Sequence, residues 1–147
     1  MTAPNPSALA IVPFVSVQDM MRIVNEIGPR QMLRELCAYI EADFLRWDMF
    51  DKTPRIPAHS AEGVIELMPI SDGAYYGFKY VNGHPANMAR GFQTVTAFGV
   101  LAKVCNGYPV LFTEMTILTA LRTAATSAMA AKYLAPNSAR TMAMIGN

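Results

Sequence analysis

Residues 63–82, GVIELMPISDGAYYGFKYVN, decide the fold of this chain. Two runs rich in β-branched and aromatic residues, 63–69 and 74–82, flank Ser71-Asp72-Gly73, which is a sequence typical of a tight turn. The pattern therefore predicts two neighbouring antiparallel strands.

Two more strands are predicted directly after this pair. They cover residues 94–104 and 108–113, and Asn106-Gly107 between them favours a two-residue hairpin turn. Four consecutive strands indicate an antiparallel meander. Residues 8–15 have the composition of a further strand, and Pro13 favours an edge position for it. Residues 1–8 are predicted to be loose.

Helical patterns surround the predicted sheet. Ser16 is a candidate N-cap with Asp19 in the first turn, Gly28 ends that helix, and Pro29 opens a second one. The apolar stripe of the second helix has 3.6-residue spacing, which predicts that its aromatic residues belong to the core. Asp43 falls on the same stripe and has no explanation from the sequence. The stripe consists of Met32, Leu33, Leu36, Tyr39, Ile40, Phe44 and Trp47.

A third helix is predicted over residues 116–134, TILTALRTAATSAMAAKYL, with Thr116 as its cap. Residues 140–145 then have the composition of a buried strand that ends at Gly146. The predicted class is α+β: a mostly antiparallel sheet meander with packed helices. The segment 51–61, DKTPRIPAHSA, contains two prolines and is predicted to be an extended connection.

Composition excludes several classes of protein. The 147 residues suit one domain, and the net charge of +1 predicts neither a nucleic-acid partner nor a membrane-binding patch. No uncharged run reaches the roughly 18 residues of a membrane span. The apolar content of 52% exceeds what a small monomer needs, which suggests burial against a partner chain or a further domain. Cys37 and Cys105 are expected to be buried, reduced thiols of a cytoplasmic protein.

Charged residues interrupt otherwise apolar elements at three positions. Glu66 and Lys79 lie within predicted strands, where they either face solvent, pair across the strands, or line a polar pocket on the sheet. Arg122 stands among small residues of the third helix. If that helix is buried, the guanidinium either pairs with an acidic side chain or binds an anion such as a carboxylate.

Other polar residues carry weaker signals. Arg55 suits a solvated loop, and Thr94 at the start of a strand is ordinary. His59 and His84 lack the spacing of metal ligands, so no metal site is predicted.

Taken together, four segments resemble the N-terminal half of enzymes of the ornithine cyclodeaminase/mu-crystallin family. They are GVIELMP, FKYVNGHPANMARG, the long stretch from GVLAKVCNGYPVLFTEM through TILTALRTAATSAMAAKYLA, and ARTMAMIGN. FKYVNGHPAN is more similar to bacterial ornithine cyclodeaminases than to mu-crystallin or to related alanine dehydrogenases.

The resemblance implies a domain organisation. Residues 9–138 would form a substrate-binding domain that also makes a homodimer through its sheet. Residues 139–147 would begin an NAD-binding Rossmann domain, most of which is missing from this sequence.

The resemblance also implies roles for single residues. Arg55, Lys79 and Arg122 would bind the substrate carboxylate, and Glu66 would be a catalytic carboxylate near the amino groups. Thr94, together with Arg122, would contact NAD. The implied function is NAD-dependent conversion of L-ornithine to L-proline and ammonia, with this chain supplying the carboxylate site and inactive alone. Two alternatives stay open: a non-catalytic binding or dimerisation module, and a relative acting as ketimine reductase or amino-acid dehydrogenase.

Overall fold

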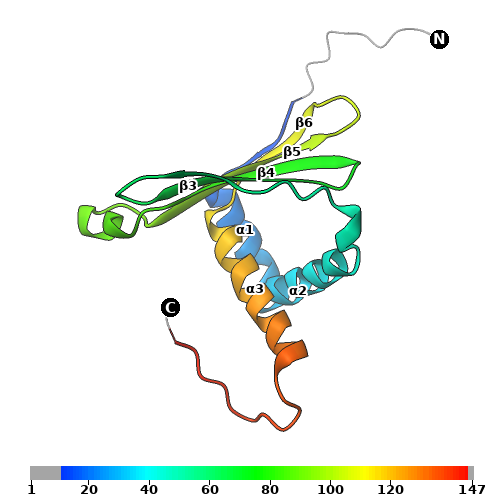
Figure 1. Ribbon diagram of the computed structural model, residues 1–147, viewed down its shortest axis with the longest axis vertical. Coiled ribbons are helices and arrows are strands. Elements are labelled where there is room, and N and C mark those ends of the chain that lie inside the picture. The colour runs from blue at the N-terminus through cyan, green and yellow to red at the C-terminus, as the bar shows by residue number, and fades with distance from the viewer. Residues whose placement is uncertain (1–10, 146–147) are drawn as a thin grey trace, which may run out of the picture.

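The computed structural model describes residues 11–145, and places its helices on one side of a sheet (Figure 1). Strands are numbered β, α-helices α and 3-10 helices η. In chain order the elements are β1 (Phe14–Val15), α1 (Val17–Ile27), α2 (Pro29–Leu45), η1 (Trp47–Met49), β2 (Ile56–His59), β3 (Val64–Ser71), β4 (Tyr75–Gly83), η2 (Pro85–Arg90), β5 (Val95–Lys103), β6 (Pro109–Glu114) and α3 (Thr116–Leu134).

The sheet has six strands in the order β1-β6-β5-β4-β3-β2. Each strand from β2 to β5 pairs antiparallel with the next one in the sequence, which confirms the predicted meander. β2 lies within the segment that was predicted only to be extended. β1 pairs in parallel with β6 at the sheet edge, where the carbonyl of Pro13 accepts a hydrogen bond from the Phe112 N–H at 3.0 Å. Residues 8–10 of the predicted first strand lie outside the described residues.

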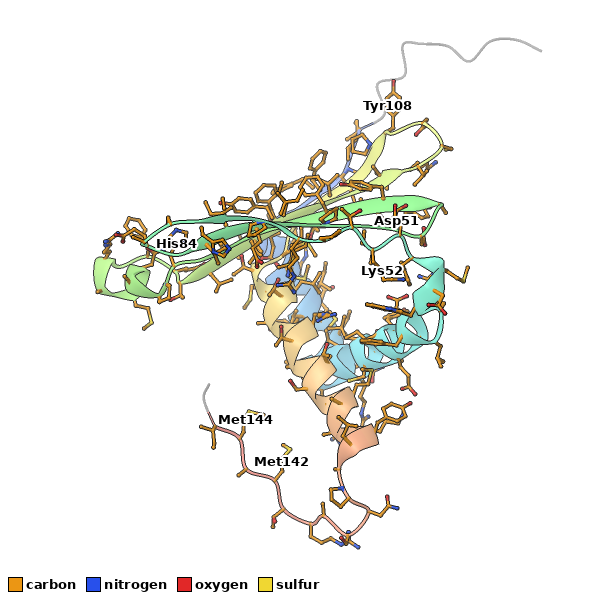
Figure 2. The ribbon with its side chains drawn as sticks, viewed as in Figure 1. Asp51, Lys52, His84, Tyr108, Met142 and Met144 are labelled. Carbon is orange, nitrogen blue, oxygen red and sulfur yellow. The ribbon has the colours of Figure 1, made fainter. Side chains whose placement is uncertain are left out.

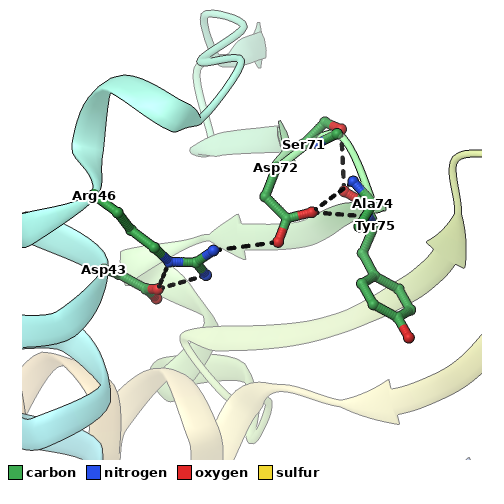
Figure 3. Close-up of polar contacts among 7 residues, drawn as sticks. Asp43, Arg46, Ser71, Asp72, Ala74 and Tyr75 are labelled. Atoms are coloured by element: carbon green, nitrogen blue, oxygen red, sulfur yellow. Dashed lines mark hydrogen bonds and ion pairs between the residues drawn. The ribbon is translucent and has the colours of Figure 1, made fainter.

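The turn between β3 and β4 is held by Asp72 (Figure 3). Its Oδ1 accepts hydrogen bonds from the N–H groups of Tyr75 at 2.8 Å and Ala74 at 3.0 Å, which lower the pKa of the carboxyl group. Arg46, just after α2, lies 3.5 Å from Asp72 Oδ2 and 2.8 Å from Asp43 Oδ1. Asp43 therefore sits on the apolar stripe as a partner of Arg46, which links α2 to this turn.

The start of α1 is a capping box, as Ser16 and Asp19 predict. The Asp19 N–H donates to Ser16 Oγ at 3.2 Å, and the Ser16 N–H donates to Asp19 Oδ2 at 3.1 Å. The hydrogen bond from the Ser16 side chain lowers the pKa of Asp19. Gly28 has a φ of 85° and separates α1 from α2, which begins at Pro29 as predicted.

The helices α2 and α3 pack against each other through small side chains. Ala125 of α3 is fully buried, and Cys37 Sγ of α2 donates to its carbonyl at 3.2 Å. Lys132 forms an ion pair with Glu41 at 2.9 Å near the other end of the contact. No helix within residues 11–145 is long and apolar enough to cross a membrane.

The prediction that the aromatic residues of α2 are core residues is wrong. Tyr39 is 68% exposed, Phe44 48% and Trp47 49%, whereas Ile40 is buried. Beyond Glu41, the last turn of α2 leads towards η1 and β2, so the end of its stripe has no facing helix (Figure 1). Phe44 and Trp47 stack on each other instead, with ring centroids 5.4 Å apart.

Two further predictions about loops need correction. The β5–β6 connection is longer than a two-residue turn, because Lys103 and Pro109 bound it and the Gly107 N–H donates to the Lys103 carbonyl. Cys105 is exposed in this connection rather than buried, and Cys37 is half-buried; both are free thiols.

The predicted strand over residues 140–145 is absent. The segment has no regular structure and is exposed, with Met142 77% and Ile145 100% accessible. A strand needs a neighbouring strand to complete its backbone hydrogen bonds, and no described strand runs beside this segment. It instead turns back along α3 (Figure 1).

The two faces of the sheet have different surroundings. The helices cover one face, and the other, called here the outer face, is bare in Figure 1. Strand register places Leu67, Tyr80 and Phe98 side by side on the outer face, where the rings of Tyr80 and Phe98 stack at 4.9 Å. Exposed apolar side chains continue across it; they are Phe14, Ile56, Ile65, Leu67, Tyr76, Phe98 and Phe112.

Candidate functional site

A cavity of about 430 Å³, called here the cation cavity, lies on the helix-covered face of the sheet. Arg55 reaches it from the segment before β2, Lys79 from β4 and Arg122 from α3. Antiparallel pairing and the packing of α3 thus bring together three cations that are far apart in the sequence. The rest of the lining is hydroxylic or apolar and consists of Leu36, Met68, Met115, Leu118, Thr119 and Thr123.

Lys79 is a lining residue whose pKa is shifted by its position in this cavity. Its neighbours in the strand register are Met68 on β3 and Gly99 on β5, and its Nζ donates to Thr119 Oγ1 of α3 at 3.4 Å. The ammonium group therefore points towards the helices rather than to the outer face.

Burial lowers the pKa of Lys79, and the positive charges of Arg122 and then Arg55 lower it further. The carboxylate of Glu66 opposes this shift. Three positive charges thus face one another with a single nearby carboxylate to offset them. An anion entering the cavity would relieve this repulsion.

Glu66 lies on the same face of the sheet as Lys79 but does not pair with it directly. In the register Glu66 is opposite Val81, and its Oε2 lies 3.5 Å from Nη1 of Arg55. The Arg55 side chain is 65% exposed, so this ion pair contributes little to stability. Of the alternatives open from the sequence, the pocket position holds for Lys79, whereas Glu66 is not among the lining residues and pairs with Arg55 beside the cavity. The Glu66–Lys79 cross-strand pair is excluded.

Arg122 is exposed and forms no ion pair with any residue in the range 11–145. The alternative that it pairs with an acidic side chain is therefore wrong for the described part of the chain. Leu118 and Thr119, four and three residues earlier, share its helix face and line the same cavity. The guanidinium is left available for a ligand.

The first turn of α3 is held by Glu114, a residue that the sequence analysis did not single out. Glu114 is 6% exposed, and its Oε2 accepts hydrogen bonds from the N–H groups of Thr116 at 2.9 Å and Ile117 at 3.2 Å. Thr116 is not the cap, because its Oγ1 accepts instead from the Ala97 N–H at 2.9 Å. The sequence did hold a signal for Glu114: it is an acidic residue just before a predicted helix, where the helix dipole favours a negative charge.

Thr94 stands apart from the cation cavity. It precedes β5, and five residues of extended chain, roughly 16 Å, separate it from Gly99 beside Lys79. Its carbonyl accepts a hydrogen bond from the His84 N–H at 2.9 Å.

A second hollow of about 690 Å³, called here the α3 groove, runs along the small-residue face of α3. Val95, next to Thr94, borders it at one end, and Met142 and Met144 close one side from the returning segment (Figure 2). Thr119 and Thr123 line both the α3 groove and the cation cavity, so the two hollows share a wall.

The histidines lie outside both hollows. His59 borders a separate surface depression, and His84 Nδ1 lies 3.2 Å from the side-chain amide of Asn82 at the η2 end of the sheet (Figure 2). Within residues 11–145 no three His, Cys, Asp or Glu side chains cluster as metal ligands.

Three further lining residues were not predicted from the sequence: Met115, Thr119 and Thr123. They follow one another at intervals of four, which is the spacing of one helix face. Arg122 lies three residues after Thr119, so helical spacing from Arg122 could have identified Thr119. Threonine and methionine are so common on buried helix faces that the residue types alone gave no reason to select them.

Comparison with known proteins assigns the chain to a family. The sequence profile described as "Ornithine cyclodeaminase/mu-crystallin family" matches residues 17–147. The chain belongs to this family. Its relatives include the ornithine cyclodeaminase of Brucella suis biovar 1 (strain 1330), which is 69% identical over the whole chain. The ornithine cyclodeaminase of Agrobacterium tumefaciens (strain Ach5) is 66% identical over 95% of the chain.

The chain spans 40% of the Brucella relative and 39% of the Agrobacterium relative. A solved structure of lysine cyclodeaminase, described for its recognition of L-lysine, L-ornithine and L-2,4-diaminobutyric acid, superposes with a TM-score of 0.79 and 26% identity, covering 85% of this chain and 39% of that one. An archaeal alanine dehydrogenase dimer with bound NAD matches with a TM-score of 0.69 and 25% identity, covering 86% of this chain and 38% of that one.

Proposed function

We propose that this chain is the substrate-binding part of an NAD-dependent ornithine cyclodeaminase, which converts L-ornithine to L-proline and ammonia. The observation that carries the proposal is the convergence of Arg55, Lys79 and Arg122 on one cavity. A carboxylate is the group that such a trio recognises, because guanidinium groups and an ammonium group donate charge-assisted hydrogen bonds to it.

Within the cavity the residues have separate tasks. The three cations hold the carboxylate, and this fixes the α-carbon in one position, which is catalysis by orientation. Glu66 does not line the cavity, but its carboxylate lies beside Arg55, which does, and acts on the charge of Lys79. It is therefore the carboxylate suited to hold an amino group or to accept a proton from it. Its contact with Arg55 at 3.5 Å is loose enough to be exchanged for a contact with substrate.

The residues present also suit a dinucleotide. The α3 groove offers a long, small-residue surface that shares Thr119 and Thr123 with the cation cavity, so a flat ring in the groove would lie beside the substrate. NAD⁺, when bound, supplies a hydride acceptor that is regenerated within the cycle. Arg122 and Thr94 would contribute to its binding from this chain, Thr94 from beside Val95 at the groove border. In the proposal, residues 139–147 begin the Rossmann domain that supplies the rest of that site.

Ornithine is the substrate favoured among those of the family. The relatives named ornithine cyclodeaminase are 66–69% identical over nearly the whole chain, whereas an archaeal alanine dehydrogenase is 36% identical over 93 residues. The proposal places the protein in the cytoplasm, where free thiols such as Cys37 and Cys105 stay reduced.

The proposal includes a homodimer formed through the outer face of the sheet. The apolar row around Leu67 and Phe98 is exposed on that face, with Leu67 39% and Phe98 47% accessible. Burial of such a row against an identical one gives a two-fold contact.

The test is an assay of the complete gene product with NAD⁺ and either L-ornithine or L-alanine. An ornithine cyclodeaminase releases proline and ammonia from L-ornithine without net formation of NADH. Net NADH from L-alanine with no proline from L-ornithine would overturn the proposal in favour of an amino-acid dehydrogenase. No turnover of either amino acid would favour a non-catalytic module.

A further inference from the structure

Beneath Met115, and not itself lining the cation cavity, lies a buried glycine whose missing side chain is replaced by that neighbour. Gly99 of β5 lies opposite Lys79 and is directed towards the helices. A Cβ atom added to Gly99 would overlap Sδ of Met115 and would lie 2.9 Å from the carbonyl oxygen of Phe78. Met115 therefore occupies the space that any larger residue at position 99 would fill.

Met115 is also a wall of the cavity. It lines the same space as the three cations, together with the apolar side chains of Leu36, Met68 and Leu118. Backbone contacts fix its position, since the Met115 N–H donates to the Ala97 carbonyl at 2.9 Å and α3 begins at the next residue. The distance between the Met115 side chain and Gly99 thus determines how much of the cavity volume is free for a ligand.

The charged and the apolar residues of the lining recognise different parts of an amino acid. The cations take the charged head of an amino acid, which leaves its methylene groups to contact the apolar lining. We propose that the contact between Gly99 and Met115 sets the length of side chain that the cavity accepts. This inference rests on the proposed function, and it makes Gly99 and Met115 specificity-determining residues.

The test uses the complete gene product with NAD⁺ and three diamino acids that differ by one methylene each: L-2,4-diaminobutyrate, L-ornithine and L-lysine. Ammonia release gives kcat/KM for each. Met115→Ala enlarges the cavity and should raise the ratio of lysine to ornithine by about tenfold or more, since one methylene in an apolar pocket is worth 10- to 200-fold. Gly99→Ala pushes Met115 into the cavity and should shift the preference towards L-2,4-diaminobutyrate.

Gly77 offers a matched control on the neighbouring strand. An added Cβ there would meet only the Val100 carbonyl at 3.5 Å and Leu101 Cδ1 at 3.9 Å, which are ordinary contacts. Gly77→Ala should keep the wild-type order and ratios of the three substrates. Because the readout is a ratio, partial loss of folded protein in Gly99→Ala does not imitate a change of specificity.

The outcomes separate this inference from the proposed function. If the wild type releases ammonia from L-ornithine but Met115→Ala and Gly99→Ala change all three substrates by one common factor, the contact does not select length and the inference is wrong. If the wild type releases ammonia from none of the three, the proposed function itself fails.

Discussion

Lys79 shows how the proposed binding site conflicts with stability at the scale of a single residue. Its ammonium group is partly buried and faces the guanidinium groups of Arg122 and Arg55, and both effects lower its pKa. A lowered pKa means that the charged form is less favourable in the folded protein than in the unfolded chain. The three cations therefore repel one another, and a bound carboxylate would relieve this repulsion.

The first prediction concerns Lys79→Met in the ligand-free protein. Removing the charge should raise the midpoint of thermal unfolding at neutral pH while it weakens carboxylate binding, because a long apolar side chain keeps the packing. In the parent, the charged ammonium group of Lys79 destabilises the fold to its full extent at any pH below its lowered pKa. This destabilisation disappears as the pH rises from that value to the ordinary 10.5, so the parent gains stability over this interval.

Circular dichroism melts of parent and variant across this pH range measure the difference. Lys103→Met, at an exposed lysine of the adjacent strand β5, is the control and should leave the midpoint nearly unchanged. A midpoint for Lys79→Met that falls at neutral pH would show that Lys79 is a stabilising residue, contrary to this account.

At the scale of elements, the start of α3 decides where Thr119 and Arg122 lie. Glu114 joins the end of β6 to the first turn of α3 through two backbone hydrogen bonds. Its other oxygen, Oε1, is buried and has no hydrogen-bond partner among the described residues. The only hydrogen bonds that the Glu114 carboxylate makes with described residues are therefore those to the start of α3, where the helix dipole favours a negative charge.

The second prediction is that Glu114→Ala destabilises the fold by about 1–2 kcal/mol, the usual loss for a helix cap. Urea unfolding of the complete gene product, followed by circular dichroism, would measure it. Glu114→Gln keeps an accepting oxygen and should lose less. Equal losses for the two variants would indicate that packing, rather than the cap, is responsible.

The elements differ in how far the sequence predicted them. Strand composition and turn residues predicted β3 and β4, and with them the strands that carry Glu66 and Lys79, because both signals are local properties. The exposed aromatics of α2 and the missing strand at 140–145 were not predictable in this way. A helix stripe or an apolar run becomes core or strand only if another element lies against it, which local patterns do not encode.

For the site, the residues alone indicated Glu66, Lys79 and Arg122 as charges out of place, while Arg55 and Thr94 rested on the family resemblance. The structure brings Arg55 to the cavity and leaves Thr94 apart from it. That difference depends on the path of the chain before β2, which two prolines make extended but do not direct.

At the scale of the whole molecule, the outer face of the sheet is an apolar surface that no described element covers. Tyr80 and Phe98 stack on it, and Phe98 is 47% exposed. The sequence indicated a surplus of apolar residues but not where they gather. An extensive apolar face of this kind marks an interface in most proteins.

The third prediction is that Phe98→Lys converts the proposed homodimer to a monomer, because a charge at the centre of an apolar interface has no partner there. Light scattering of the complete gene product after size-exclusion chromatography gives the mass. Tyr39→Lys, at an exposed aromatic of α2 on the opposite side of the sheet, should leave the mass unchanged. A parent that is itself monomeric would rule out the interface.

The claim on which the rest depends is that three cations hold the carboxylate of an amino acid. Its most direct test compares kcat/KM of the complete gene product for L-ornithine and for L-ornithinamide, which has the same carbon chain and no negative charge. Charge-assisted hydrogen bonds are worth about 1.5–3 kcal/mol each, so the amide should be poorer by about a hundredfold or more. Similar values for the two compounds would contradict the claim.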